Sequence, residues 1–372
     1  MKLFLLTIFS AGAILAATPA LAQQGDCDAG LWRVNDECVD PSTYEFDAGW
    51  NAVDPGGETI CAAGTPFRFW MRPGASDDLL VFFQGGGGCW DYDTCQPDGR
   101  WYKHSVYDDE ISHYRGGIFD LDNPDNPFRD YNTIFIPSCN GDVYMGNSVV
   151  EYQNAAGDVL THNFKGFVNG SAAIGFVADT FPTPESIFVT GCSAGSVGSA
   201  MFAPYLIDQY PGVPVAQLGD SLAFVFHRPV NMEVEHGARS NFAGWIPGLQ
   251  ALDTSAFLMA DYYAALTNFY PDYTFAQFNS LSDHVQIRYY EAIGGNDWER
   301  DLTASLDSIH ERAGNFRSFT AGGEQHCVTP NANFYDYAID GIPLRDWVAD
   351  MAAGIDVPSL RCDDCRVPER IP

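Results

Sequence analysis

Short apolar runs recur along most of the chain, separated by stretches with helical spacing. A continuous apolar run at residues 79–83 is typical of a strand buried on both faces, and the segment 66–72 alternates in the manner of a half-buried strand. Further strands are predicted at 133–137, 187–190, 213–218, 274–278 and 316–320, and helices at 170–177 and 199–210. Strands that alternate with helices predict an α/β fold, with a mostly parallel sheet covered by helices on both faces.

Two stretches interrupt this alternation. Residues 91–131 are rich in Tyr, Trp, Asp and Pro, and residues 223–270 are rich in aromatic and apolar side chains. Each follows a predicted strand, and insertions at that position in this architecture commonly overhang the active site. Ordinary core helices are the alternative for the second stretch.

The central stretch of the chain is residues 186–202, with the sequence SIFVTGCSAGSVGSAMF. A predicted strand leads into Gly191-Cys192-Ser193-Ala194-Gly195, and a helix pattern follows over 196–210. Strand, glycine-flanked turn and helix form the context of a nucleophile elbow, which holds a serine hydroxyl at the end of a sheet. A simple Gly/Ser-rich turn is the alternative, and the flanking strand and helix favour the elbow.

The first 22 residues predict a secretory signal peptide. Lys2 precedes the apolar run 3–17, and Pro19-Ala20-Leu21-Ala22 offers a cleavage site before Gln23. We therefore expect a secreted or periplasmic protein with no membrane span. The mature chain divides into a cysteine-bearing N-terminal arm at 23–57 and one large domain at 58–372.

The chain is strongly acidic, with a formal net charge of −30. A field of this sign disfavours polyanionic partners, so nucleic acid is not an expected ligand. Solubility in a salty habitat is a sufficient cause of the acidity.

Ten cysteines in an exported chain predict disulfides rather than metal ligands. Cys27–Cys38 would close the N-terminal arm, and Cys362–Cys365 would be a local bridge near the C-terminus. Cys61–Cys139 and Cys89–Cys95 are also expected. No cofactor or metal is expected.

A serine nucleophile needs a base, and in the α/β-hydrolase order the acid and then the histidine follow the serine. His326 lies in a loop directly after the predicted strand 316–320, where the base belongs; His284 and His310 are its competitors. Asp283 follows the strand 274–278 and is the favoured acid, with Asp220 as the alternative.

Backbone donors for an oxyanion are also present. Residues 84–90, QGGGGCW, directly follow the strand 79–83, and a run of glycines there lets N–H groups point into a cleft. The N–H of Ala194, next after the serine, is a second donor. A phosphate-binding loop is disfavoured because no Lys-Ser/Thr follows the glycines.

Cys192 precedes the serine and Cys327 follows the candidate base. If Ser193 and His326 are neighbours, the two cysteines could fall within disulfide distance, and we expect Cys192–Cys327 to be bonded. The alternative is that each is a small buried residue or pairs elsewhere, such as Cys192 with Cys139. The same Cys-Ser, Asp, His-Cys arrangement resembles tannases and fungal feruloyl esterases over these short motifs only.

A broader resemblance covers residues 58–330. The segments CAAGTPFRFW (61–70), FFQGGGGCWD (82–91), NPFRDY (126–131), CNGDVYMG (139–146) and GCSAG (191–195) are similar to blocks of the pectin acetylesterase and Notum family of secreted hydrolases, as are Thr94-Cys95, Gly117–Asp120 and Asp220-Ser221. The resemblance implies an α/β-hydrolase fold and ester hydrolysis by a triad of Ser193, His326 and, by a looser match, Asp283. It also implies that Gly86, Gly87 and Ala194 are the oxyanion donors. Four consecutive glycines stand here where relatives usually carry an aromatic residue.

The resulting hypothesis is an exported carboxylic ester hydrolase that removes acetyl or other acyl groups from a glycan or a similar ester through an acyl-enzyme. The acidic charge argues against polygalacturonate as substrate. A feruloyl, aryl or polyester hydrolase is the alternative within this chemistry. A non-catalytic binding protein on a hydrolase fold and a peptidase are alternatives from other classes.

Overall fold

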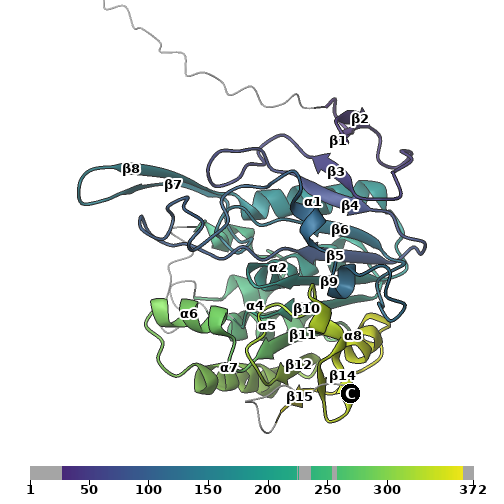
Figure 1. Ribbon diagram of the computed structural model, residues 1–372, viewed down its shortest axis with the longest axis vertical. Coiled ribbons are helices and arrows are strands. Elements are labelled where there is room, and N and C mark those ends of the chain that lie inside the picture. Colours follow the sequence, from purple (N-terminus) through teal and green to yellow (C-terminus); the bar gives the residue numbers. More distant parts are fainter. Residues whose placement is uncertain (1–26, 224, 226–235, 254–257, 363–372) are drawn as a thin grey trace, which may run out of the picture.

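The computed structural model describes residues 27–223, 225, 236–253 and 258–362 of the chain. Within these residues, eleven strands form one central sheet in the order β15-β12-β11-β10-β9-β5-β6-β4-β3-β1-β2 (Figure 1). The strands of this sheet are β1 (Trp32–Val34), β2 (Glu37–Val39), β3 (Asn51–Asp54), β4 (Phe69–Arg72), β5 (Leu79–Phe83), β6 (Asn132–Ile136), β9 (Ile187–Cys192), β10 (Val215–Asp220), β11 (Thr274–Ser280), β12 (Phe316–Ala321) and β15 (Leu360–Arg361).

The seven strands from β6 to β15 are parallel to one another, and the four N-terminal strands join antiparallel at the edge formed by β6. The mixed, mostly parallel sheet flanked by helices is that of an α/β hydrolase. Strand β5 lies between β9 and β6, so the ends of β5 and β9 are adjacent. Residues that directly follow these two strands therefore lie close together, at the carboxyl ends of the parallel strands.

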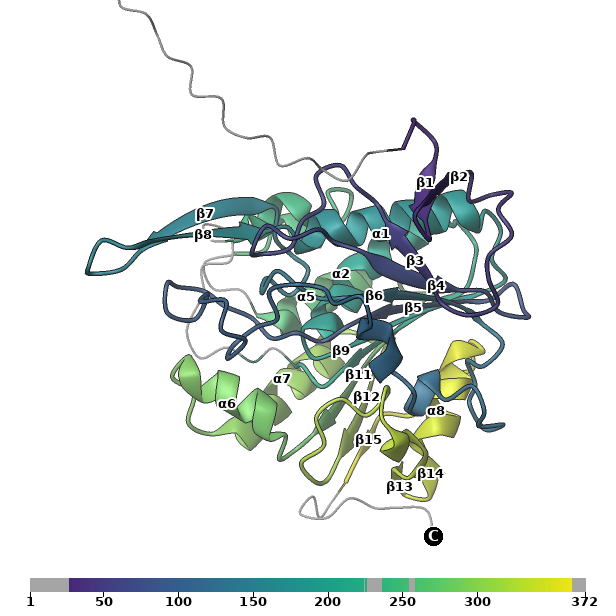
Figure 2. The ribbon, with the colours of Figure 1, turned by 45° about the horizontal axis from the view of Figure 1, so that its top comes forward.

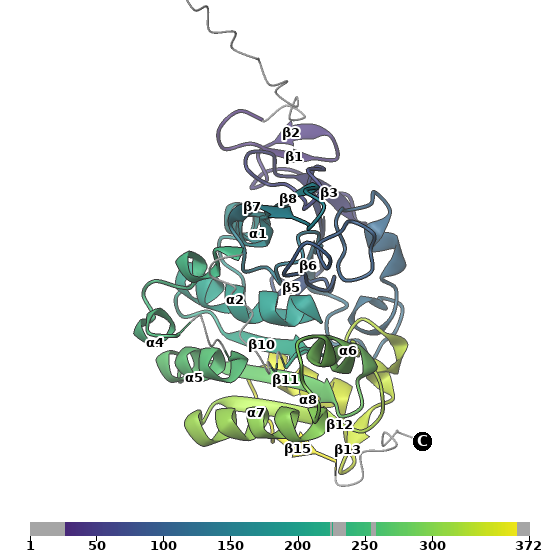
Figure 3. The same cartoon turned by 90° about the vertical axis from the view of Figure 1, so that its left-hand side faces the viewer.

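Helices cover both faces of the sheet, as the pattern predicted (Figure 3). One face packs under α1 (Gly166–Thr180), α2 (Ala194–Gln209), α5 (Met259–Phe269) and α7 (Trp298–Arg312). The other face packs under α8 (Leu344–Ala352) and the 3₁₀ segments η1 (Glu110–His113), η2 (Gly117–Phe119) and η5 (Ala332–Tyr335). Successive residues of β5 alternate between the two cores, which is why this strand is a continuous apolar run.

The remaining elements belong neither to the eleven-stranded sheet nor to the long helices that cover it. They are α4 (Pro247–Gln250), α6 (His284–Ala292), η3 (Ala238–Asn241), and the two-stranded pairs β7 (Ser148–Gln153) with β8 (Val159–Phe164) and β13 (Ala338–Ile339) with β14 (Ile342–Pro343). The β7–β8 hairpin extends away from the body of the molecule (Figures 1 and 2). No helix in the described ranges is long and apolar enough to cross a bilayer.

The two predicted insertions differ in structure. Residues 91–131 form irregular loops with η1 and η2, and they return beside the loop that follows β5. The described part of the second stretch contains η3, α4 and the core helix α5, whose Tyr262 and Tyr263 are buried. Residues 224, 226–235 and 254–257 of that stretch lie outside the described residues, as do the predicted signal peptide and Cys365 of the predicted Cys362–Cys365 bridge.

Candidate active site

Ser193 occupies a sharp turn between β9 and α2. Its backbone angles are φ 55° and ψ −123°, a conformation that side-chain-bearing residues rarely adopt. The flanking glycines are required by crowding: a Cβ on Gly191 would lie 2.2 Å from the carbonyl oxygen of Gly195, and a Cβ on Gly195 would lie 1.9 Å from that of Phe83. The turn leaves Ser193 partly exposed at the N-terminus of α2, where the helix dipole favours negative charge.

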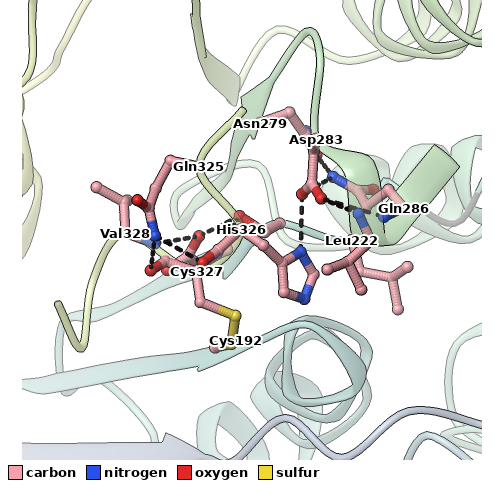
Figure 4. Close-up of polar contacts among 12 residues, drawn as sticks. Cys192, Leu222, Asn279, Asp283, Gln286, Gln325, His326, Cys327 and Val328 are labelled. Atoms are coloured by element: carbon pink, nitrogen blue, oxygen red, sulfur yellow. Dashed lines mark hydrogen bonds and ion pairs between the residues drawn. A yellow bond between two sulfur atoms is a disulfide. The ribbon is translucent and has the colours of Figure 1, made fainter. Parts of the chain in front are cut away.

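The imidazole of His326 is paired with the carboxylate of Asp283. Nδ1 of His326 lies 2.8 Å from Oδ2 of Asp283, and the other ring nitrogen points away from the carboxylate (Figure 4). The Asp283 side chain is fully buried, whereas 16% of the His326 side chain is exposed. A buried carboxylate that holds one nitrogen of an accessible imidazole leaves the other nitrogen free to exchange a proton.

Asp283 is also the N-cap of α6. Its carboxylate accepts hydrogen bonds from the backbone N–H groups of Val285 (3.0 Å) and Gln286 (3.1 Å). The side chain of Gln286 donates to the same carboxylate (3.1 Å) and to Asn279 (3.1 Å). Sequence reasoning missed Gln286, although Asp283-x-x-Gln286 is the spacing of a capping box and could have indicated it.

Asp220, the alternative acid, contacts the backbone of the loop that carries His326 and does not contact the imidazole. Its fully buried carboxylate accepts hydrogen bonds from the hydroxyls of Ser221 (2.7 Å) and Thr329 (2.6 Å) and from the backbone N–H groups of Val328 (3.2 Å) and Thr329 (2.7 Å). Burial raises the pKa of Asp220, against the lowering effect of these donors. Its backbone carbonyl accepts from the N–H of Ser193 at 2.7 Å, so Asp220 links the elbow to the loop after β12.

The competing histidines lie elsewhere. His284 is exposed at the start of α6, and His310 on α7 contacts Ser318 Oγ at 3.0 Å. Burial lowers the pKa of His310.

A disulfide joins Cys192 to Cys327, with a Cα–Cα separation of 5.3 Å (Figure 4). It therefore ties the residue before Ser193 to the residue after His326. Cys27–Cys38, Cys61–Cys139 and Cys89–Cys95 are also bonded, so four of the five expected pairs are present among the described residues. This number of bridges fits an oxidising compartment.

The glycine loop after β5 packs against the elbow. A Cβ on Gly85 would lie 3.0 Å from Cβ of Ser193, and a Cβ on Gly87, whose φ is +74°, would lie 2.0 Å from the carbonyl oxygen of Trp101. Among the described residues, the N–H groups of Gly86, Gly87 and Ala194 donate to no protein acceptor. Free donors beside a serine are what an oxyanion requires.

A largely apolar pocket opens beside Ser193 and Ala194. Its walls come from the glycine loop, from the segment after β10, and from α6 and the start of α7. Its lining includes Gly87, Gly88, Trp90, Val143, Leu222, Val225, His236, Gln286, Tyr289, Ile293 and Trp298. The contributions of α6 and α7 were not expected from the sequence.

Two clusters in the described residues have the composition of a metal site, Cys192–His326–Cys327 and Cys89–Cys95–His162. Both cysteines of each cluster are joined in a disulfide, so neither cluster has a thiolate to offer. Their histidines alone make a poor ligand set.

The pectinacetylesterase family model matches residues 50–307 of the chain. The chain belongs to the pectinacetylesterase family. The match begins at β3 and ends within α7, so it includes the glycine loop, Ser193 and Asp283, while His326 lies after it.

Two relatives in this family are similar over a shorter part. The chain is 27% identical over 150 residues to a palmitoleoyl-protein carboxylesterase NOTUM of Schmidtea mediterranea, and 24% identical over 144 residues to pectin acetylesterase 4 of Arabidopsis thaliana. Each alignment covers 37% of this chain, and they cover 26% and 33% of the respective relatives. The matches thus span about a third or less of the relatives' own length. Family membership and both names support an esterase.

Proposed function

We propose that this protein is an exported serine esterase that removes acyl groups from carboxylic esters, with acetylated glycans as the first class of substrate to test. The proposal depends chiefly on the Asp283–His326 pair. The disulfide between Cys192 and Cys327 ties the loop that carries His326 to the end of β9, directly before Ser193. The relatives named as carboxylesterase and acetylesterase support the same chemistry.

In the proposed reaction, Oγ of Ser193 attacks the ester carbonyl carbon and His326 Nε2 takes the hydroxyl proton. The carbonyl oxygen becomes an oxyanion, which the N–H groups of Gly86, Gly87 and Ala194 stabilise. When the C–O bond to the alcohol breaks, the leaving alkoxide takes the proton from His326, and an acyl-enzyme remains. Water, deprotonated by His326, then releases the acid and restores the serine. Asp283 orients the imidazole and stabilises its charged form throughout.

The pocket beside Ser193 suits the acyl group. Its apolar and aromatic walls would desolvate a hydrocarbon chain or a ring, whereas a sugar hydroxyl would be poorly paired there. We therefore place the acyl group in this pocket and the alcohol part towards solvent. A pocket with these walls also keeps aryl and feruloyl esters as candidate substrates.

The test compares the wild-type protein with Ser193→Ala and His326→Ala on acetyl, butyryl, octanoyl and feruloyl esters, with and without acetylated glycans. We expect both variants to be folded and to lose hydrolysis, and the double variant to be little worse, because triad members act as a unit. Wild-type turnover in either single variant would overturn the assignment. A folded wild-type protein that hydrolyses none of these esters would favour a binding protein.

A further inference from the structure

A buried ion pair lies next to the glycine loop, in a part of the chain that the proposed mechanism does not use. Nζ of Lys103 is 2.6 Å from Oε2 of Glu110, and the two side chains are only 19% and 9% exposed. Both residues belong to the irregular segment 91–131. A buried ion pair gains little stability over an apolar pair of similar volume, because desolvation offsets the attraction. Its presence here therefore calls for another explanation.

The pair holds Gln84, the residue at which the glycine loop begins. Nε2 of Gln84 donates to Oε1 of Glu110 at 2.5 Å, and Oε1 of Gln84 accepts from Nζ of Lys103 at 3.1 Å. Nε2 also donates to the hydroxyl of Tyr114 at 2.9 Å. Oε1 additionally accepts from the N–H of Ser138 at 3.3 Å. The amide nitrogen and the amide oxygen of Gln84 thus have two hydrogen-bond partners each.

Backbone hydrogen bonds from the segment 91–131 also bind the glycine loop. The N–H of Lys103 donates to the carbonyl oxygen of Gly86 at 2.8 Å, and the N–H of Gly88 donates to that of Trp101 at 3.2 Å. These two bonds flank Gly87 and leave its own N–H free. Lys103 therefore contacts the loop through its backbone at Gly86 and through its ammonium at Gln84.

We infer that Lys103 and Glu110 form a positioning pair that fixes the direction of the free N–H groups of Gly86 and Gly87 towards the oxyanion. This inference rests on the proposed function. The loop has no side chains of its own between Gly85 and Gly88, so nothing within it restricts its conformation. Hydrogen-bond donors act on a developing charge only when they are held in place before the reaction.

The electrostatic state of the network agrees with this role. Burial lowers the pKa of the Lys103 ammonium, and Glu110 opposes that shift. Burial raises the pKa of Tyr114 to about 12, so its hydroxyl stays protonated at neutral pH. The amide of Gln84 therefore lies between one cation, one anion and one neutral hydroxyl, and each has a defined orientation.

The test measures kcat and KM on p-nitrophenyl acetate and the inhibition constant of an alkyl trifluoromethyl ketone. Addition of the serine oxygen to that ketone produces an oxyanion, so its affinity reports the donors directly. For Lys103→Met we expect kcat to fall by about 10- to 100-fold, because misplaced donors lose part of the ~10²–10³ that one oxyanion donor supplies. KM should change by less than about threefold, and the inhibition constant should rise in parallel with the fall in kcat.

Two further variants make the experiment decisive. Tyr114→Phe removes one hydrogen bond to Gln84 and keeps the ring, so it should fold and show the same pattern on a scale of a few-fold. Arg317→Met breaks the ion pair between Arg317 on β12 and Asp356 in the loop before β15, whose atoms are 2.5 Å apart. We expect it to lower the melting temperature and leave kcat and the inhibition constant unchanged.

Unchanged kcat and inhibition constant in folded Lys103→Met would overturn the inference, and so would unchanged values in Tyr114→Phe if Lys103→Met does not fold. A fall in kcat with no change in the inhibition constant would also overturn it. These results differ from a failure of the proposed function, in which the wild-type protein itself hydrolyses no ester or Ser193→Ala remains active.

Discussion

Asp283 and Asp220 are both fully buried carboxylates near the loop that follows β12, yet they bind different groups. Asp283 pairs with the imidazole of His326, whereas Asp220 accepts four hydrogen bonds from Ser221, Val328 and Thr329. The first arrangement is the one that the proposed triad needs to orient His326, and the second fixes the backbone of the loop after β12. The two residues should therefore respond differently to the same substitution.

We predict that Asp283→Asn lowers kcat by up to ~10⁴-fold, the scale known for losing the acid that orients a triad histidine. Asp220→Asn should cost far less activity but lower the free energy of unfolding by about 1–3 kcal/mol. The reason is that the amide NH2 group would face hydroxyl and N–H donors that now bind a carboxylate oxygen. Steady-state kinetics and chemical denaturation of both variants check this. The reverse ranking of kcat would give the catalytic role to Asp220.

Gly88 is a glycine that neither the backbone nor the packing requires. Its φ is not in the left-handed region, and a Cβ there would make only ordinary contacts, 3.5 Å from the carbonyl oxygen of Gly141 and 3.9 Å from Val143. It nevertheless lines the pocket beside Ser193. The missing side chain thus leaves space in the pocket.

We predict that Gly88→Leu narrows the acyl pocket. Turnover of octanoyl and feruloyl esters should fall by about 10-fold or more relative to acetyl esters, which is the scale of steric discrimination in an apolar pocket. Gly88→Ala should change the ratio little and is the control. An equal loss on all esters would mean that the substitution disturbs the loop and that Gly88 does not set acyl size.

At the scale of elements, the loop after β12 is held in three ways. Asp220 and Ser221 bind its backbone, the Asp283 carboxylate binds His326, and the disulfide to Cys192 crosses 135 residues of sequence. Cys327 itself has φ +63°, an unfavourable conformation for a cysteine, so the loop depends on its tethers.

We predict that Cys192→Ala with Cys327→Ala lowers stability by ~2–5 kcal/mol, as is typical for a native bridge. Activity should fall at temperatures where circular dichroism still reports a folded protein, because a small displacement of His326 breaks its alignment with Ser193. The variant Cys27→Ala with Cys38→Ala, which removes the bridge between the segment before β1 and strand β2, is the control. Parallel loss of fold and activity would show that the bond between Cys192 and Cys327 serves stability alone.

The elements that local pattern determines were predicted well. Strand β5 was predicted with its observed ends, and β9, the elbow and α2 were recognised because strand, turn and helix are contiguous there. Strands β1 to β3 were missed, because they are only three or four residues long. Strand β3 pairs with β4 and with β1, and β1 also pairs with β2. The hairpin β7–β8 was also missed, although apolar positions flank a Gly-containing turn at residues 154–158.

The same distinction applies to the candidate site. Order along the chain indicated Ser193, Asp283 and His326 as candidates, since loops after parallel strands meet at one edge. The contact between Asp283 and His326 spans 43 residues, and the Lys103–Glu110 pair joins an irregular loop to the start of the 3₁₀ helix η1. Their approach depends on tertiary packing, which no sequence period encodes. The pocket walls from α6 and α7 were missed for the same reason.

At the scale of the whole molecule, three buried titratable groups lie around the β7–β8 base and α1. Burial lowers the pKa of His162 to about 4, and it lowers that of His236 to about 4 as well. Burial raises the pKa of Asp142 to about 6, although its carboxylate accepts from the N–H groups of Gly166 (2.7 Å) and Tyr144 (3.1 Å). These groups act on stability in opposite directions over the same pH range.

The signs follow from proton binding. Between about pH 6.5 and pH 4 the unfolded chain protonates His162 and His236 and the folded chain does not, so each of these two histidines makes stability fall as the pH falls. Between about pH 6 and pH 4 the folded chain protonates Asp142 before the unfolded chain does, so Asp142 makes stability rise as the pH falls. Each of the three pKa shifts corresponds to about 3 kcal/mol in the free energy of unfolding. The effect of the two histidines therefore exceeds the opposite effect of the one aspartate.

We therefore predict that, with respect to these three groups, the free energy of unfolding decreases on acidification from pH 6.5 to pH 4. His162→Gln should make this decrease shallower, because it removes one proton taken up on unfolding. Asp142→Asn should make it steeper, because it removes the one group of the three that opposes the decrease. Urea denaturation at half-unit pH steps measures all three slopes. A steeper curve in His162→Gln, or a shallower one in Asp142→Asn, would contradict the assignment, and equal slopes in all three proteins would show that other carboxylates dominate the acid response.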